Sequence, residues 1–180
     1  MLNFLVSLKQ KDLSAMSAQQ MLQSHPISTQ NGLISPVSID RYEMIHLDYS
    51  GEIPSDEVIS HIEQSYIFWN PSKHRLILTA SDLPKVQHGI YFNVYRKTPL
   101  HLSSKADQLQ QLIPNLSLQH VTSSDIWAMH FSTPINASDI DAINHHWVVS
   151  SKPSEGLFCH PLIHECNALQ PSELAALFNE

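Results

Sequence analysis

Residues 89–107 read GIYFNVYRKTPLHLSSKAD, and this stretch in the middle of the chain decides which fold we expect. Residues 90–95 carry β-branched and aromatic side chains, which pack well on a pleated, half-buried surface and so favour a strand. Pro99 ends the strand, because proline has no N–H to donate to a neighbouring strand. Ser104 and Asp107 have the spacing of a capping box, which predicts that a helix begins here.

The segments before this stretch predict two further helices between strands. Apolar residues alternate where strands are expected and recur at helical spacing where helices are expected. Ser14 and Ser55 stand at the positions of helix caps. The expected elements are a strand at 2–8, a helix from 14 that ends before Pro26, strands at 33–39 and 41–49, a helix from 55 that ends before 70, and a short strand at 76–78.

The segments after this stretch repeat a similar order. The helix from Ser104 is followed by two more strands, by a helix that Asn136 and Asp139 cap, and by a short apolar piece. The expected elements are strands at 116–121 and 126–131 around a turn at 123–125, a helix from 136 to 147, an apolar piece at 162–163 and an amphipathic tail at 171–178.

The two series of elements predict an internal repeat. Residues 6–9 match 94–97, residues 44–47 match 128–131, and Asn70-Pro71 matches His160-Pro161. The order β-α-β-β-α-β is the ferredoxin-like plan, with an antiparallel sheet. We therefore expect an α+β protein in which a first half (1–83) and a second half (84–166) pack as a pseudo-dimer, followed by a tail (167–180). This packing would bury apolar surface that each half alone leaves exposed.

The composition argues against several classes of function. A formal net charge of −7 gives no basic surface for nucleic acid, and only 4 glycines are present, without a GxGxxG or P-loop motif for nucleotides. The N-terminus does not resemble a signal peptide, and no apolar run approaches the ~20 residues that span a bilayer. Both points favour a cytoplasmic protein in which the 2 cysteines are reduced, and we expect it to bind neither nucleic acid nor membrane.

Cysteines and histidines near the C-terminus are the first candidates for chemistry. Cys159, His160, His164 and Cys166 are of types that bind zinc, and a zinc or thiol enzyme would use Cys159 and His160. However, no CxxC pair is present and Pro161 interrupts the group, so packing on a terminal strand is the favoured interpretation. His46 and His130, at matching positions of the two repeats, are interpreted in the same way. We expect no catalytic residue, metal or cofactor.

The central stretch also carries a family resemblance. Thr98-Pro99 and residues 102–107 (LSSKAD) resemble the N-terminal domain of the single-chain phosphoribosylformylglycinamidine synthases, where a proline-rich turn precedes a Ser-Ser-Lys-Ala helix start. Short matches at 13–15, 40–47 and 116–131 extend the resemblance over roughly residues 1–166. That domain is similar to a dimer of PurS, the small subunit of the multi-subunit enzyme, and PurS chains carry an Asn-Pro like Asn70-Pro71.

The resemblance implies a PurS-like subunit without a catalytic residue of its own. Such a subunit docks a PurL-like synthetase and a PurQ-like glutaminase for ammonia transfer in de novo purine biosynthesis. The residues that the resemblance marks for docking are Pro99, Ser103, Ser104, Lys105, Asp107, Asn70, Pro71, His160 and Pro161. The sequence also departs from the family at four places. Residues 96–99 replace the family's Arg-Pro-Gly turn and lack its glycine, and Leu102 replaces its tryptophan. Residues 123–125 replace the basic segment that enters the last strand pair, and His160-Pro161 replaces the Asn-Pro of the second half.

A second interpretation starts from the ferredoxin-like plan alone. Regulatory modules of the ACT kind share this plan and bind a small metabolite at the interface between two halves. The low glycine content counts against such a module, because its sites commonly use tight turns near the ligand. Binding of a lone metabolite without partner proteins would favour it.

Overall fold

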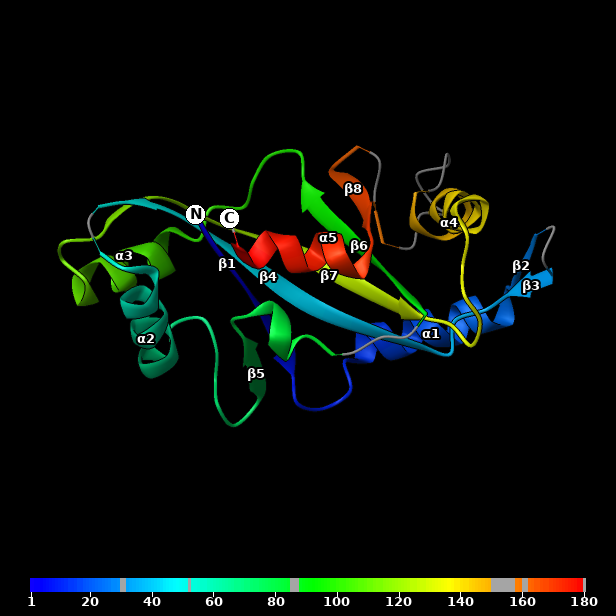
Figure 1. Cartoon of the computed structure of the whole chain (residues 1–180), viewed down its shortest axis with the longest axis horizontal. Coiled ribbons are helices and arrows are strands. Elements are labelled where there is room, and N and C mark those ends of the chain that lie inside the picture. The colour runs from blue at the N-terminus through cyan, green and yellow to red at the C-terminus, as the bar shows by residue number, and fades with distance from the viewer. Residues whose placement is uncertain (30–31, 52, 85–87, 150–157, 160–161, 180) are drawn as a thin grey trace.

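A six-stranded antiparallel sheet forms the centre of the protein, with strand order β5-β1-β4-β7-β6-β8. A computed structural model of the chain describes residues 1–29, 32–51, 53–84, 88–149, 158–159 and 162–179 (Figure 1). The sheet strands are β1 (Leu2–Leu8), β4 (Ser38–Ser50), β5 (His74–Ile77), β6 (Gly89–Arg96), β7 (Ser117–His130) and β8 (His164–Leu169). A separate hairpin joins β2 (Ile27–Thr29) to β3 (Gly32–Ile34).

Five α-helices within the described part of the chain surround the sheet, so the α+β class is confirmed. They are α1 (Leu13–Ser24), α2 (Ser55–Ser65), α3 (Ser103–Leu112), α4 (Ala137–Ile143) and α5 (Pro171–Ala176). A π-helical turn at Asn144–Val148 continues α4, and 3-10 turns occur at Ala80–Asp82 and Leu177–Asn179. None of the helices among the described residues has the length and apolar character to cross a membrane.

The two central strands are longer than the sequence indicated. β4 and β7 pair from Ser38 opposite His130 to Ser50 opposite Ser117, with one shift in register between Asp48 and Tyr49. The predicted turn at 123–125 is therefore wrong, because these residues lie inside β7. Side-chain contacts with β4 hold them there: Arg41 binds Asp125 and His46 binds Ser124. Only the first residues of the strand expected at 33–39 form β3, and the last two belong to β4.

At the start of three helices, the predicted cap residue is wrong. Asp12, not Ser14, caps α1, since its Oδ1 accepts the backbone N–H groups of Ser14 at 2.7 Å and Ala15 at 3.2 Å. Ser55 and Ser104 already lie inside α2 and α3, whose N-cap residues, Pro54 and Leu102, make no side-chain cap bond. A capping residue needs a non-helical backbone, so neither serine can serve. The Asn136–Asp139 capping box is confirmed.

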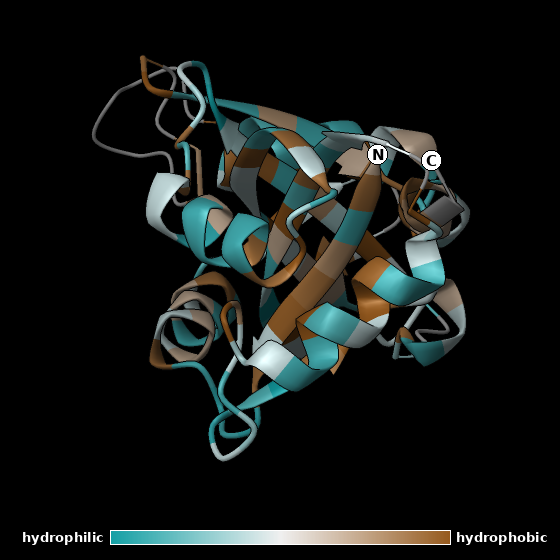
Figure 2. Cartoon of the chain, turned by 90° about the vertical axis from the view of Figure 1, so that its left-hand side faces the viewer, coloured by the Kyte–Doolittle hydropathy of each residue, from teal (hydrophilic) through white to brown (hydrophobic). Residues whose placement is uncertain are grey.

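The four larger helices cover one face of the sheet as two pairs. At one end α1 and α4 pack on β4, β6 and β7 in a cluster that includes Leu22, Phe92 and Ile143. At the other end α2 and α3 pack on β1, β4 and β7 in a cluster that includes Ile62 and Leu109. Figure 2 shows the second end with hydrophilic residues on the outward surfaces of the helices. Each cluster thus combines a helix from before residue 84 with one from after it.

The opposite face carries the C-terminal segment. Leu5, Met44 and Ile126 lie on this face and pack against Leu174 of α5. Side chains alternate between the faces of a strand, so these residues point away from their neighbours under the helix pairs. Figure 1 shows α5 lying across this face. The sheet is therefore covered on both sides, and most apolar residues of its central strands are buried.

Candidate functional site

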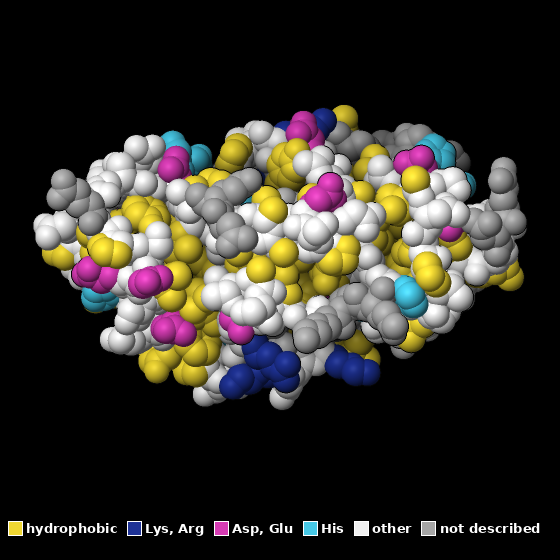
Figure 3. All heavy atoms as spheres, viewed as in Figure 1, with side chains coloured by type: hydrophobic (Ala, Val, Ile, Leu, Met, Phe, Trp, Pro, Cys, Tyr) yellow, Lys and Arg dark blue, Asp and Glu magenta, His cyan; other side chains and the backbone are white. Residues whose placement is uncertain are grey.

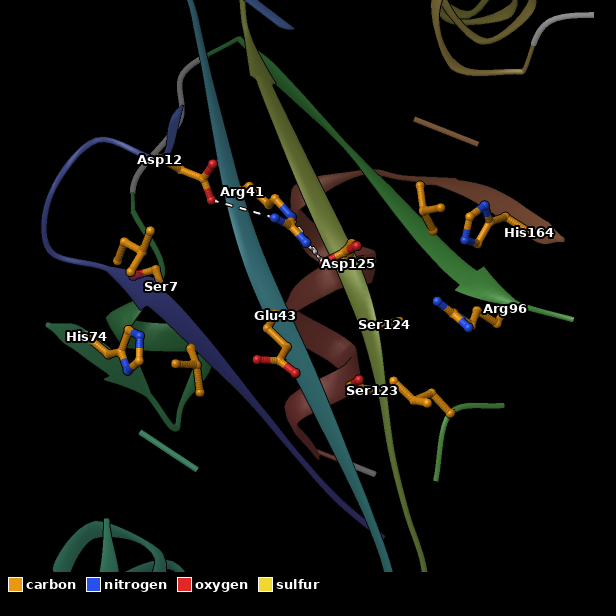
Figure 4. A pocket seen from close by; sticks show the side chains of 14 residues that line it. Ser7, Asp12, Arg41, Glu43, His74, Arg96, Ser123, Ser124, Asp125 and His164 are labelled. Atoms are coloured by element: carbon orange, nitrogen blue, oxygen red, sulfur yellow. Dashed lines mark hydrogen bonds and ion pairs between the residues drawn. The ribbon is translucent and has the colours of Figure 1, made fainter. Parts of the chain in front are cut away.

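A pocket of about 440 Å³ lies over the middle of the sheet, between the two helix pairs. Arg41 and Glu43 of β4 contribute to its floor, and Asp125 of β7 lies beside them (Figure 4). Because side chains alternate along a strand, Arg41 and Glu43 share their face with Ile39 and Ile45, which belong to the two helix-covered clusters. The long β4 and β7 thus present charged residues at the point that neither helix pair covers.

The floor of this pocket is arranged symmetrically. Val6 of β1 pairs with Glu43, Glu43 pairs with Asp125, and Asp125 pairs with Val94 of β6. Across strands β1, β4, β7 and β6, this row therefore contains a valine, an acidic residue, a second acidic residue and a valine, which is the same order in both directions. On the next strands outward, His74 pairs with Leu8 and His164 pairs with Arg96. Both histidines line the pocket, one from each edge strand.

Arg41 is held by two carboxylates and a ring. Its Nε and Nη2 donate to Oδ1 of Asp125 at 3.1 and 2.9 Å, and its Nη1 lies 3.8 Å from Oδ2 of Asp12. The guanidinium carbon also lies 5.5 Å from the ring centre of Trp127. Charge-assisted contacts of this kind fix the orientation of an arginine. The guanidinium group of Arg41 is therefore already occupied by contacts within the protein.

Glu43 lacks such partners. It is half-buried and makes no hydrogen bond or ion pair with any of the described residues. It lies directly opposite Asp125, whose Oδ2 is also unengaged within the described part of the chain. Like charges in opposite positions of neighbouring strands are destabilising. The pocket floor thus combines an ion pair, Arg41 and Asp125, with the carboxylate of Glu43, whose negative charge has no partner among the described residues.

Most of the docking residues that the resemblance marks lie at the α2–α3 end. Lys105 Nζ lies 5.4 Å from the ring centre of Phe68, which follows α2 and comes shortly before Asn70. Asn70 and Pro71 form a turn, in which Asn70 Oδ1 accepts the backbone N–H of Ser72 at 2.9 Å and Pro71 accepts from Lys9 Nζ at 2.6 Å. The structure therefore places Lys105 beside Phe68, whereas the Asn70–Pro71 turn contacts Lys9, just after β1.

The other docking candidates differ in how the structure places them. Ser103, Ser104 and Asp107 lie exposed in the first turns of α3, and Pro99 lies exposed in the loop before it. The backbone N–H of Leu102 donates a hydrogen bond to the backbone carbonyl of Val121 at 2.8 Å, which holds this loop against β7. His160 and Pro161 fall outside the described residues.

The two cysteines are placed as packing residues. Cys159 is buried in the α1–α4 cluster, and Cys166 is packed against the same cluster. Burial raises the pKa of Cys159, and burial raises the pKa of Cys166 to about 12. Since the thiolate is the nucleophile and the metal ligand, these thiols are poorly suited to either task at neutral pH. Among the described residues, no group of three or more His, Cys, Asp or Glu is placed to hold a metal.

His46 and His130 do not occupy matching positions. When Val6 is superposed on Val94, the pairing registers put Ala128, not His130, in the place of His46. His46 lies on the α5 face, with Nδ1 2.8 Å from Asn3 Oδ1 and Nε2 3.0 Å from Ser124 Oγ, and burial lowers its pKa. His130 instead contacts Asp40 at 3.0 Å. The sequence match of residues 44–47 to residues 128–131 was therefore wrong by two residues, because the pairing registers match 44–47 to 126–129.

Sequence reasoning missed the residues that form the pocket floor. Arg41, Glu43 and Asp125 were read as parts of a strand and a turn, without a role. The signal that could have found them is the polar stretch inside an otherwise apolar strand, where Asp125 matches Glu43. Comparison of the chain with protein-family models, with curated proteins and with solved structures finds no match.

Proposed function

We propose that this chain is a non-catalytic PurS-like subunit of a phosphoribosylformylglycinamidine synthase, built as two fused PurS-like halves. The observation that carries the proposal is the symmetry of the sheet. In each half the first strand lies in the middle of three, β5-β1-β4 and β7-β6-β8, and the halves meet at the central Glu43–Asp125 pair. A fused ferredoxin-like pseudo-dimer has this kind of arrangement, and the resemblance to the family was reached from other residues.

The helix pairing supports the same proposal. α1 shares a cluster with α4, and α2 shares one with α3, so each half contributes one helix to each cluster. A symmetric pair of subunits exchanges equivalent elements in this way. The two halves would then act as one rigid platform, which is the property that a docking subunit needs.

The proposed docking surface lies at the α2–α3 end and along the adjacent edge of the sheet. It comprises Ser103, Ser104 and Lys105 at the start of α3 and the Asn70–Pro71 turn. Figure 3 shows Lys and Arg side chains gathered at one edge of the molecule, beside β5, with acidic and hydrophobic side chains interspersed elsewhere. We infer that a PurL-like synthetase or a PurQ-like glutaminase presents an acidic surface to this edge.

The test is reconstitution with a PurL-like synthetase and a PurQ-like glutaminase. We expect the three proteins to co-elute in size-exclusion chromatography and to amidate formylglycinamide ribonucleotide faster with glutamine than the two enzymes alone. Lys105→Glu should weaken the complex about tenfold or more, because it reverses a charge at the docking surface. Lys97→Glu, an equal charge change just after β6, on the other side of the sheet from β5, serves as the control. A mixture that neither co-elutes nor gains rate would refute the proposal.

A second candidate, an ACT-type regulatory module, is favoured by one observation. The central pocket lies where the two halves meet, which is where such modules bind a small metabolite. A thermal-shift screen with amino acids and purine intermediates tests it. A large shift with a lone metabolite, in the absence of partner proteins, would support this candidate.

A further inference from the structure

The floor of the central pocket presents carboxylate oxygens that need a cation. Both oxygens of Glu43 and Oδ2 of Asp125 make no hydrogen bond or ion pair with the described residues, and the two residues are directly opposite on paired strands. Arg41 cannot neutralise them all, because it already binds Asp125 Oδ1 and lies near Asp12. Two adjacent carboxylates with free oxygens gain most when a bound cation lies between them.

A primary ammonium group fits this floor better than a metal ion. An ammonium has three N–H donors and no acceptor, so it can bond three carboxylate oxygens at once. A metal would need a fuller set of ligands, and none of the described residues form a group of three or more that could hold one. The cation that the floor selects is therefore an organic amine in its protonated form.

Arg96 provides the opposite charge at the side of the same pocket. It extends from β6 toward the central strands (Figure 4), and its guanidinium makes no hydrogen bond or ion pair with the described residues. A guanidinium binds a carboxylate in a planar, two-pronged contact. Apolar lining from Val6, Val94 and Leu100 lies between and around these charges. The pocket thus carries a negative floor, a positive side and an apolar remainder.

We propose that the central pocket binds a small zwitterion of the α-amino acid class. Its ammonium lies between Glu43 and Asp125, and its carboxylate meets Arg96. A volume of about 440 Å³ accommodates a molecule of this size and excludes a folded partner. The inference deepens the second candidate function by naming its ligand class, and it does not depend on the docking role.

The test is isothermal titration calorimetry of the full chain with three sets of probes. The first set is the common amino acids, the second is their amides, which keep the amine and lose the carboxylate, and the third is their N-acetyl forms, which lose the cation. We expect at least one free amino acid to bind, with its amide and its N-acetyl form about tenfold weaker or more. An amide that binds as tightly as the acid would assign the site to an amine alone and overturn the zwitterion.

Two variants connect the binding to these residues. Glu43→Gln keeps the shape of the floor and removes its charge, and Arg96→Gln does the same at the side. Each should weaken binding about tenfold or more, and Glu63→Gln on the exposed side of α2 should leave it unchanged. Unchanged affinity in Glu43→Gln would overturn the inference, as would a lack of binding by every amino acid.

The outcomes separate this inference from the proposed functions. If a purine intermediate binds and no amino acid does, the zwitterion is wrong while a metabolite-binding module stands. If nothing binds but the three-protein complex forms, the pocket inference and the module both fail while the docking role stands. Circular dichroism of each variant at the temperature of the titration shows that it is folded.

Discussion

Glu43 and Asp125 put two like charges face to face at the centre of the sheet. We expect Glu43→Gln, without ligand, to unfold with the same or a slightly higher free energy than the unchanged protein, by up to about 1 kcal/mol, since it removes a repulsion between opposite strand positions. Urea denaturation measures the difference. A loss of stability of more than about 1 kcal/mol would show that Glu43 serves the fold rather than a ligand.

His46 should make the stability of the protein depend on pH. Asn3 Nδ2 donates to the carbonyl of Leu177 at 2.6 Å, so Asn3 Oδ1 accepts from His46 Nδ1–H, and His46 Nε2 accepts from the Ser124 hydroxyl. This network fits the neutral ring, and burial lowers the His46 pKa below its ordinary value of 6.5. The unfolded chain therefore binds a proton at a pH where the folded protein does not.

The free energy of unfolding should consequently be fully maintained above the ordinary histidine pKa and fall as pH drops below it. We expect His46→Gln to show a smaller fall than the unchanged protein between about pH 7.5 and about pH 5.5 in urea denaturation. The exposed His145→Gln variant is the control and should keep the original fall. An identical pH dependence in all three proteins would contradict this role for His46.

Gly51 occupies a backbone position that other residues rarely adopt. Its φ is +136°, and a Cβ atom there would lie 3.3 Å from the backbone oxygen of Asn115. We expect Gly51→Ala to lower the free energy of unfolding by about 1–3 kcal/mol, from backbone strain and from this contact together. Gly32→Ala, at φ +116° with none of the described residues within 4 Å of its Cβ atom, isolates the strain. Equal costs in the two variants, measured by urea denaturation, would show that the Asn115 contact is unimportant.

At the scale of elements, α1 depends on the residue before its first turn. Asp12 accepts two backbone N–H groups of α1 and also lies near Arg41, so it connects the helix cap to the pocket. We expect Asp12→Ala to cost about 1–2 kcal/mol of stability. Ser14→Ala, which removes the hydroxyl that the sequence marked as the cap, should change stability by less than about 0.5 kcal/mol. Thermal unfolding of the two variants compares them directly, and the reverse ranking would restore Ser14 as the cap.

Local patterns predicted the existence of most elements better than their ends. The strand at 90–95 and the helix that follows it were expected from β-branched residues and from apolar spacing, and both are present. The turn expected at 123–125 was wrong because serines and an aspartate are typical of turns, while here the side chains of Ser124 and Asp125 bind residues of β4. Such contacts join positions far apart in sequence, and a local pattern carries no information about them.

At the scale of the whole molecule, the two helix pairs make each half dependent on the other. We expect residues 1–84 and 88–180, produced as separate fragments, to be unfolded alone, because each lacks one helix of each apolar cluster. When mixed, they should associate and regain the circular dichroism spectrum of the intact chain. Cooperative thermal unfolding of either fragment by itself would contradict this dependence.

The amino-acid sequence by itself determined the α+β class, the order of most strands and helices, and the Asn136–Asp139 cap. These features depend on residues near one another in the chain, through backbone propensity, apolar spacing and capping. The tertiary structure alone decided the register of β4 on β7, the exchange of helices between the two clusters, and the pocket over Glu43 and Asp125. The physical reason is that a shift of strand register changes which residues meet while leaving every local pattern the same.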